Sequence, residues 1–443
     1  TIPPRFPEKP RTALTSSPMA TPSTAPTEHA GPTRVDYTPF QLANGLTGYV
    51  IEDRHAPRVA INLLYQVGAR DEHPARTGMA HLFEHLMFGG SAHAPEYDVP
   101  VQRAGGENNA FTNSDITNYY LVLPPSQLET AFWLESDRMH ALNLTPDTLR
   151  VQKSVVQEEF KQRYLNQPYG DAYLHMRPLK FTTHPYRWMT IGEKLEHIEA
   201  VTLEEAQAFY SSFYAPNNAI LVVAGDVRAS EVERLAQKWF GDLPARQVNR
   251  PTRSPEPPQT QARRQALTGP VPQTAVYRAY PCPARTDAAY PVVDLLTDLL
   301  SNGQAGRLYQ HLVKDKQLAT QAGAFTWGLY DPGMLSVDAR LVDGVDPDTY
   351  LTALEEVLAS LQHVPSQELL RIQNKIEAQE VFQRTKVLHR ALALALFASM
   401  GHPEWINTIV EQYRAVRPTD VEAAAAEWLS PTLSTTLVYG PEA

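Results

Sequence analysis

The chain has 443 residues, of which 43% are hydrophobic and 20% are charged, a composition typical of folded globular proteins with room for more than one domain. The formal net charge is −10 at pH 7, and no long lysine or arginine run occurs, which argues against a nucleic-acid partner. No stretch of about 18 apolar residues exists, which argues against a membrane span. The single cysteine, Cys282, excludes an internal disulfide framework and multi-cysteine metal sites.

Proline is the compositional outlier, with 37 residues that cluster in two places. Residues 1–36 are rich in proline, serine and threonine and poor in large apolar side chains, so we expect an extended tail there. A second proline-rich stretch, residues 246–272, predicts a semi-rigid linker between two halves. The tail, on a chain that does not start with Met, favours export to a bacterial periplasm over a cytoplasmic location.

The two halves end alike. A helix that starts at Thr202 leads through Pro216 into an apolar strand at 220–223, and a helix that starts at Thr419 leads through Pro431 into a strand at 437–439. Equal halves around a linker predict an internal duplication. We therefore expect an N-terminal module over residues 37–245 and a homologous C-terminal module over residues 273–443.

Strands open the first module. The Asn44-Gly45 turn lies between apolar runs, a strong hairpin signal, and residues 59–67 form another strand pattern. Apolar residues then recur at three- and four-residue steps from Met79 to Leu86, as in an amphipathic helix. The fold class expected is α+β: two modules, each with an antiparallel-rich sheet and helices packed on one sheet face.

The helix at Met79 carries the pattern His81-Leu82-Phe83-Glu84-His85. Side chains four residues apart lie on one helical face, so the two imidazoles can converge on one ion. Glu84 lies beside them, where a carboxylate could accept a proton from attacking water. The pattern predicts a zinc site; the alternative interpretation is a solvated helix face.

A catalytic zinc site needs a third protein ligand. Residues 149–163 form a charged amphipathic helix pattern, with Val151, Val155, Val156 and Phe160 interpreted as its inner side. Both Glu158 and Glu159 lie in this helix, and spacing alone does not choose between them.

These features resemble the pitrilysin, insulinase and mitochondrial-processing-peptidase family of zinc metallopeptidases, whose inverted zinc motif is followed by a Glu about 75 residues later. The similarity spans roughly residues 37–443. Further stretches that carry it are Gly105–Thr112, Val155–Glu159, Asn166–Gly170, His184–Tyr186, Tyr214–Asn218 and Gly306–Tyr309.

The resemblance implies roles for individual residues. His81, His85 and Glu159 would hold one Zn²⁺ per chain, and Glu84 would be the general base. The backbone of Asn109 and Ala110 would pair with an extended peptide substrate. Phe88 resembles the apolar residue beside the cleavage site, with plain core packing as the alternative.

Two departures from the family pattern stand out. Gln152 occupies a position where many members carry a carboxylate that supports the metal ligands. Lys314 and Thr320 occupy positions where members carry an Arg and a Tyr that hold the substrate backbone, and neither supplies those groups. We therefore expect a homologous but different partner subunit to supply the Arg/Tyr pair, although Arg307 or Tyr309 of this chain could position substrate instead.

The resemblance implies a zinc-dependent endopeptidase that hydrolyses peptides or unfolded polypeptides in a chamber formed with a partner subunit. The alternative within the family is a non-catalytic core subunit that binds peptides or a partner without hydrolysis. An unrelated hydrolase with an independently arisen metal site is the other alternative.

Overall fold

The structure is a computed structural model and describes residues 34–328 and 330–442. The predicted tail, residues 1–36, lies outside this part of the chain except for its last three residues. Val35 is buried, its N–H donates to Asn407 Oδ1 at 2.8 Å, and its carbonyl accepts from Asn407 Nδ2 at 2.9 Å. The predicted boundary at residue 36 is therefore too late, because the apolar Val35 already packs on the second module.

The first module is built on a six-stranded sheet with the strand order β1-β2-β6-β3-β5-β4. The β2–β6 pair is parallel and the other pairs are antiparallel. Its strands are β1 (Thr38–Gln41), β2 (Thr47–Glu52), β3 (Val59–Tyr65), β4 (Glu107–Thr112), β5 (Thr117–Leu123) and β6 (Ala219–Gly225). Its helices are α1 (Met79–Leu86), α2 (Asp98–Arg103), α3 (Leu128–His140), α4 (Pro146–Phe160), α5 (Ala172–Lys180), α6 (Leu195–Glu199), α7 (Leu203–Phe213) and α8 (Ala229–Phe240).

The second module is built on a five-stranded sheet with the order β7-β11-β8-β10-β9, in which the β7–β11 pair is parallel. Its strands are β7 (Arg263–Gly269), β8 (Ala275–Cys282), β9 (Ala319–Trp327), β10 (Gly333–Leu341) and β11 (Thr435–Pro441). Its helices are α9 (Tyr290–Ser301), α10 (Pro347–Ala359), α11 (Ser366–Arg384), α12 (Val387–Ser399), α13 (Trp405–Ala415) and α14 (Pro418–Trp428).

The two sheets confirm the expected duplication. Without β1, the first sheet reads β2-β6-β3-β5-β4, and the second reads β7-β11-β8-β10-β9, which is the same order of the corresponding strands. The helix–strand pair that ends each half is also present, as α7 with β6 and α14 with β11. The α+β fold class with two homologous modules is therefore confirmed.

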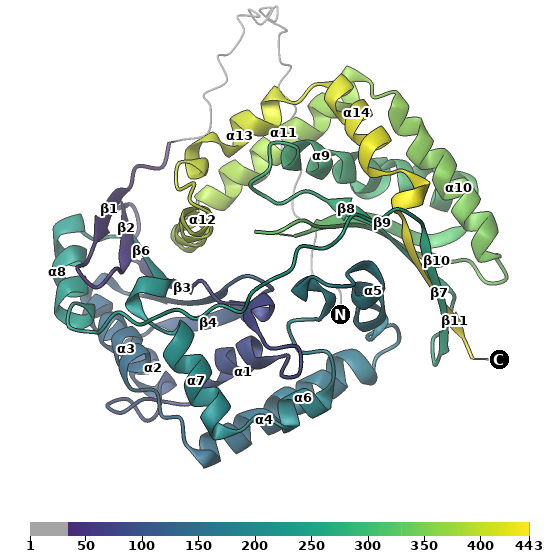
Figure 1. The fold of residues 1–443 in the computed structure, drawn as a ribbon. Helices are drawn as coiled ribbons and strands as arrows, with labels where there is room; N and C mark the ends of the chain where they lie inside the picture. The colour runs from purple at the N-terminus through teal and green to yellow at the C-terminus, as the bar shows by residue number, and fades with distance from the viewer. Residues whose placement is uncertain (1–33, 329, 443) are drawn as a thin grey trace, which may run out of the picture.

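Each module also covers the free sheet face of the other. Helix α12 of the second module packs against β3 and β6, and helix α5 of the first module packs against β11 and β7 (Figure 1). Buried residues of α12, among them Leu394, share one apolar cluster with Leu64 and Val222 of the first sheet. Met176 of α5 shares another with Leu437. Each sheet therefore has the expected helix layer of its own module on one face and a helix of the other module on the opposite face.

The segment between the modules departs from the expected linker of residues 246–272. Residues 263–269 form β7, whose side chains alternate in exposure along the strand. Because this edge strand has the polar composition of a linker, the sequence pattern did not indicate a strand there. The preceding irregular stretch is anchored to the first module: Arg250 and Arg253 both bind the Asp71 carboxylate, at 2.9 and 2.7 Å.

Candidate metal centre

Helix α1 is positioned by an acidic residue that precedes it in the chain. The Glu72 carboxylate accepts hydrogen bonds from the backbone N–H groups of Gly78 and Ala80, each at 2.8 Å. Glu72 is only 2% exposed, and the helix has no side-chain N-cap of its own, since its N-cap residue is Gly78 with φ +90°. Glu72 therefore satisfies donors that the first turn of any helix leaves unpaired.

One side of α1 anchors it in the module. Leu82, Phe83 and Leu86 are buried in the core of the first module. Because residues three and four apart share a helical face, His81 and His85 lie together on another side. The apolar residues predicted from the sequence therefore fix the orientation of α1, and this orientation determines where the two imidazoles point.

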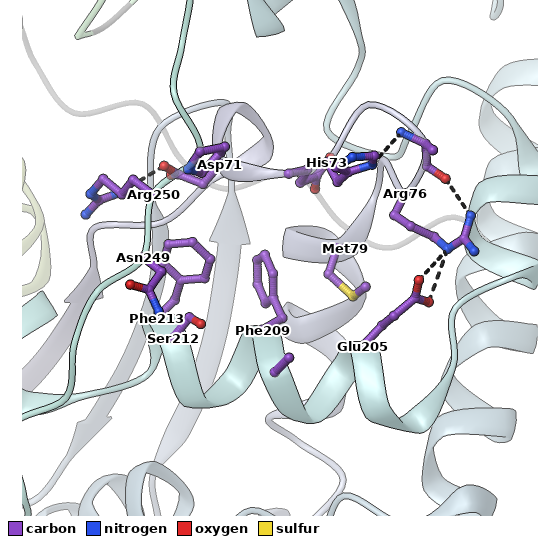
Figure 2. Close-up of a pocket in the computed structure, with 14 residues that line it drawn as sticks. Asp71, His73, Arg76, Met79, Glu205, Phe209, Ser212, Phe213, Asn249 and Arg250 are labelled. Atoms are coloured by element: carbon purple, nitrogen blue, oxygen red, sulfur yellow. Dashed lines mark hydrogen bonds and ion pairs between the residues drawn. The ribbon is translucent and has the colours of Figure 1, made fainter.

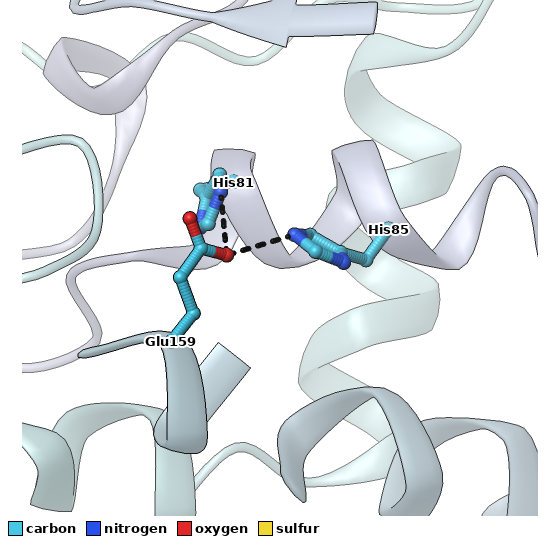
Figure 3. A group of neighbouring side chains, drawn as sticks. All are labelled: His81, His85 and Glu159. Carbon is cyan, nitrogen blue, oxygen red and sulfur yellow. Dashed lines mark ion pairs between the residues drawn. The ribbon is translucent and has the colours of Figure 1, made fainter. Parts of the chain in front are cut away.

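The structure brings His81, His85 and Glu159 together (Figure 3). Nε2 of His81 lies 3.6 Å from Oε2 of Glu159, and Nε2 of His85 lies 3.4 Å from the same oxygen. Among residues 34–328 and 330–442, this is the one group of three or more His, Cys, Asp or Glu side chains whose ligand atoms lie within 4.8 Å of one another. All three residues are half-buried.

Glu159 and Glu158 differ in their surroundings. Glu158 is exposed on α4 and contacts Gln162, with 3.1 Å from its Oε1 to the amide nitrogen. Glu159 faces α1, and its second oxygen, Oε1, lies 2.8 Å from the Arg163 guanidinium in the π-helix that follows α4. The structure therefore places Glu159 and not Glu158 beside the histidines.

The three side chains suit a zinc ion. Two imidazole nitrogens and one carboxylate oxygen form a donor set of catalytic zinc sites. Burial, with the His85 charge second, lowers the pKa of His81 to about 4, so its ring is neutral at pH 7 as metal binding requires. The hydrogen bond to His85 lowers the pKa of Glu159 below its usual value and keeps it ionised.

Glu84 and Gln152 occupy different positions around this cluster. Glu84 is half-buried beside His85 and Thr112, and burial raises the pKa of its carboxyl above the usual value while Thr112 and His85 oppose that rise. Gln152 is half-buried on α4. Nδ1 of His81 is buried without a hydrogen-bond partner in the described protein, so Gln152 does not hold that ring, and its supporting role stays a prediction.

Strand β4 is the edge of the first sheet and lies against α1. Asn109 is exposed on this strand, and its Oδ1 accepts a hydrogen bond from the backbone N–H of Ala110 at 2.8 Å. The Asn109 side chain therefore occupies the Ala110 N–H, a backbone donor at the open edge of the sheet. The geometry allows the predicted pairing of a peptide with Asn109 and Ala110, and the pairing itself stays a prediction.

Phe88 lies in an aromatic group just after α1. Its ring centroid is 5.4 Å from that of Tyr97 and 5.9 Å from that of Tyr119, and the Arg138 guanidinium lies 5.4 Å from it. Tyr97 and Tyr119 are buried core residues, and these contacts favour the alternative that Phe88 serves core packing. Phe88 is nevertheless half-buried, and its contact with substrate stays a prediction.

In the second module, Lys314 and Thr320 are both exposed. Lys314 Nζ donates to Gln310 at 3.0 Å, and Thr320 Oγ1 donates to the Arg340 carbonyl at 3.3 Å. Arg307, the alternative positioning residue, is held within the module: it binds both Glu368 carboxylate oxygens, at 3.2 and 2.7 Å. Its guanidinium is therefore already committed to a structural contact.

Two features of the site differ from the sequence-based interpretation. Val151 and Val155 are 41% and 44% exposed, so placing them on the inner side of α4 is wrong. The buried side is formed by Leu149, Val156 and Phe160, which share one helical face because they are spaced seven and four residues apart. The sequence does not point to Glu72, since no motif distinguishes a capping carboxylate that lies seven residues before the start of α1.

A cavity of about 680 Å³ lies at the N-terminal end of α1, between α7 and residues 249–251 (Figure 2). Phe209, Phe213 and Met79 line it, and an Arg76–Glu205 ion pair at 3.0 Å closes one end. None of the side chains of the metal cluster lines this cavity, so it is separate from the candidate site.

Two duplicated modules and a His-His-Glu cluster on the first of them match the arrangement that the family resemblance leads us to expect. The family model described as insulinase (peptidase family M16) matches residues 49–182, and the model described as peptidase M16 inactive domain matches residues 200–376. The chain belongs to peptidase family M16. The match to the inactive domain begins in the first module, just before α7, and extends into α11 of the second module.

Individual relatives agree with this assignment. The zinc protease PqqE of Helicobacter pylori is 29% identical over 394 residues, which cover 86% of this chain and 88% of that protein. The crystal structure of a protease from Helicobacter pylori matches with a TM-score of 0.87 and 28% identity, over 92% of this chain and 100% of that one. The first half of the periplasmic protease PqqL from Escherichia coli shares the fold at 18% identity, with a TM-score of 0.73 over 92% and 93% of the two chains.

In the described residues, no helix is both long enough and apolar enough to cross a membrane.

Proposed function

We propose that this protein is a zinc-dependent endopeptidase that hydrolyses peptides or unfolded polypeptides. The observation that carries the proposal is the convergence of His81, His85 and Glu159, with Glu84 beside them. The alternative of a non-catalytic core subunit fits a chain in which this cluster is degraded, and here all four side chains are present.

His81, His85 and Glu159 would hold the zinc ion, which when bound lowers the pKa of water to about 7 and polarises a carbonyl. Glu84 would accept a proton from the attacking water and return it to the leaving amine. Its half-buried position limits competing contacts with solvent.

Strand β4 would bind the substrate backbone. A sheet edge offers unpaired N–H and C=O groups to an extended peptide, and β4 is such an edge beside α1. The Asn109 side chain holds the Ala110 N–H at 2.8 Å and would yield that donor to the incoming strand. A peptide paired there would pass the metal cluster in extended form.

A homologous but different subunit would complete the site. Lys314 and Thr320 are exposed and lack a guanidinium and a phenol, and Arg307 is bound to Glu368. A partner that carries the Arg/Tyr pair would supply the substrate contacts this chain lacks. The periplasm is the proposed location, supported by the periplasmic relative from Escherichia coli.

Glu84→Gln tests the proposed function. The variant should keep one zinc per chain, because all three ligands remain, and should lose peptide hydrolysis by about 10²–10⁴-fold, because an amide cannot accept the proton. Metal analysis and hydrolysis of a quenched fluorescent peptide measure the two properties. Wild-type hydrolysis by the zinc-loaded variant would remove Glu84 from the mechanism, and a wild-type chain that binds no zinc would favour the scaffold alternative.

A further inference from the structure

The edge strand β4 has two different faces. Its residues alternate in exposure, with Glu107, Asn109 and Phe111 exposed and the residues between them half-buried. Thr112 lies beside Glu84 on the side of α1. Since successive side chains of a strand point to opposite faces, Phe111 lies on the opposite side of the sheet, which α12 covers in part.

A cavity of about 510 Å³ opens on this opposite face. It lies between strands β3, β4 and β5 of the first module and helices α11 and α12 of the second. Its volume is within the range of small-ligand sites. Apolar side chains from both modules line most of it: Leu64, Phe111, Ile116, Leu392, Leu396 and Phe397.

Polar groups line the rest of the cavity. They include Arg285, Glu380 and Gln383. Burial raises the pKa of Glu380 above its usual value, against the pull of Arg384 and Arg285. Phe111 itself is 39% exposed, so the cavity is bordered by an accessible aromatic ring next to the open edge of β4.

A peptide that pairs with β4 continues the alternation of the sheet. Every second side chain of that peptide points toward α1 and the metal cluster, and those between point toward the face that carries the cavity. The metal cluster and the cavity are therefore presented to the same bound strand from its two sides.

We propose that this cavity is a substrate subsite, which takes a large apolar side chain from the face of the peptide opposite to the metal. The inference rests on the proposed function and adds a specificity determinant to it. Residues of the second module, chiefly Leu392, Ala393 and Leu396 of α12, select the side chain although the cleavage chemistry belongs to the first module.

The test uses zinc-loaded Glu84→Gln protein, which keeps the binding surface. Its affinity for a fluorescent leucine-containing peptide is measured by anisotropy, with leucine replaced by alanine at one position at a time. Losses at positions served by the cavity should be about tenfold or more, the effect of burying one large apolar side chain.

Ala393→Phe, which fills the cavity, should abolish these losses only at alternate peptide positions, namely those whose side chains point toward the cavity. Leu392→Ala, which enlarges the cavity, should shift the preference at the same positions toward larger side chains and serves if the first variant does not fold. Phe382→Ala is the matched control: this ring is 73% exposed on α11, does not line the cavity, and should leave every affinity unchanged.

The outcomes separate the two proposals. Peptide binding that is unaltered by both cavity variants would overturn the subsite and leave the peptidase proposal standing. Changes at consecutive peptide positions, on both faces of the bound strand, would also overturn the subsite, since they would indicate a general loss of binding. Zinc-loaded protein that binds no peptide, either alone or with a homologous subunit that carries the Arg/Tyr pair, would overturn the proposed function and the subsite together.

Discussion

The two oxygens of the Glu159 carboxylate have separate partners. Oε2 faces both imidazoles, at 3.6 and 3.4 Å, while Oε1 is held by Arg163 at 2.8 Å. Arg163 is 70% exposed, so its contact is screened by solvent and contributes little to stability. Its effect is to orient the carboxylate, so that one oxygen alone is offered to the histidines.

Replacing Glu159 should therefore affect zinc binding far more than replacing its neighbour. Glu159→Ala removes one of three ligands and should weaken zinc binding by more than about 100-fold, beyond the effect of changes outside the ligand set. Glu158→Ala removes an exposed side chain and should leave the affinity within about twofold. Competition with a zinc chelator measures both. Reversed effects would mean that the third ligand is Glu158.

The sequence predicted much of this site because its chemistry is local. The spacing of His81 and His85 on one helix requires no tertiary information, and the same holds for the nearby Glu84. Glu159 came from the family resemblance, since two adjacent glutamates on one helix cannot be told apart by spacing. The contact of Arg163 depends on a π-helical turn after α4, which no pattern in the sequence marks.

At the scale of single elements, α1 depends on a carboxylate outside the helix. Glu72 accepts from two backbone donors at the start of α1, and the second of them, Ala80, directly precedes His81. The position of the first imidazole is thus coupled to a buried side chain in the preceding loop.

Glu72→Ala should lower both the stability and the zinc affinity. It leaves buried N–H groups without acceptors, at a cost of about 1–3 kcal/mol each, and frees the first turn of α1. Asp346→Ala is the control, because Asp346 caps α10 in the second module and its loss should cost about 1 kcal/mol without affecting zinc. Urea unfolding and chelator competition are measured for both. Zinc affinity unchanged in Glu72→Ala would show that the cap serves folding alone.

Elements whose pattern was local were predicted better than those defined by tertiary contacts. The Asn44-Gly45 turn joins β1 to β2, with Gly45 at φ +89°, as the sequence indicated. The sequence predicts linker where β7 lies, because the partner strand β11 is at the far end of the chain. The packing of α12 on the first sheet was equally hidden, because an apolar helix does not specify which sheet it covers.

Across the whole molecule, a partly buried ionic group joins the two modules. Arg70 lies between Asp115 of the first module, at 3.1 Å, and Asp331 of the second, at 2.7 Å. His184 and Arg253 also face Asp331. Burial alone would raise the pKa of Asp331, but His184 and Arg70 outweigh it and lower that pKa to about 2.

This group makes the contact between the modules depend on pH. A carboxyl whose pKa is about 2 when folded and about 3.9 when unfolded stabilises the folded state above about pH 4 and loses that effect as the pH falls toward 2. Burial raises the pKa of Asp115 to about 6, so Asp115 responds in the opposite direction.

Asp331→Asn should lower the free energy of unfolding by about 1–2 kcal/mol at pH 7, and the difference from wild type should shrink between pH 4 and pH 2. Asp36→Asn is the control, because this exposed carboxylate pairs with exposed Arg34 and its replacement should change stability little. Urea unfolding at several pH values measures both. A difference that stays constant down to the lowest pH would exclude an ionic contribution of Asp331.

The second module does not carry the Arg/Tyr pair that the family resemblance leads us to expect at positions 314 and 320. The first module carries the complete metal cluster, whereas Lys314 and Thr320 stand exposed in the second module without contacts to it. In a pair of identical chains, two metal sites would face no Arg/Tyr pair, while a mixed pair would have one complete site. Orienting the scissile bond matters because a displacement of about 1 Å can cost about a hundredfold in rate.

We therefore expect the purified chain to hydrolyse peptides slowly and to gain at least about tenfold when Lys314→Arg and Thr320→Tyr are introduced together, or when a homologous subunit that carries both residues is added. Lys316→Arg is the matched control, because Lys316 is already paired with Glu356 in the same segment. Zinc content is measured in parallel, so that a gain in rate is not a gain in metal. Full activity of the unaltered chain by itself, with no increase from the double substitution, would show that the chain supplies its own substrate contacts and needs no different partner.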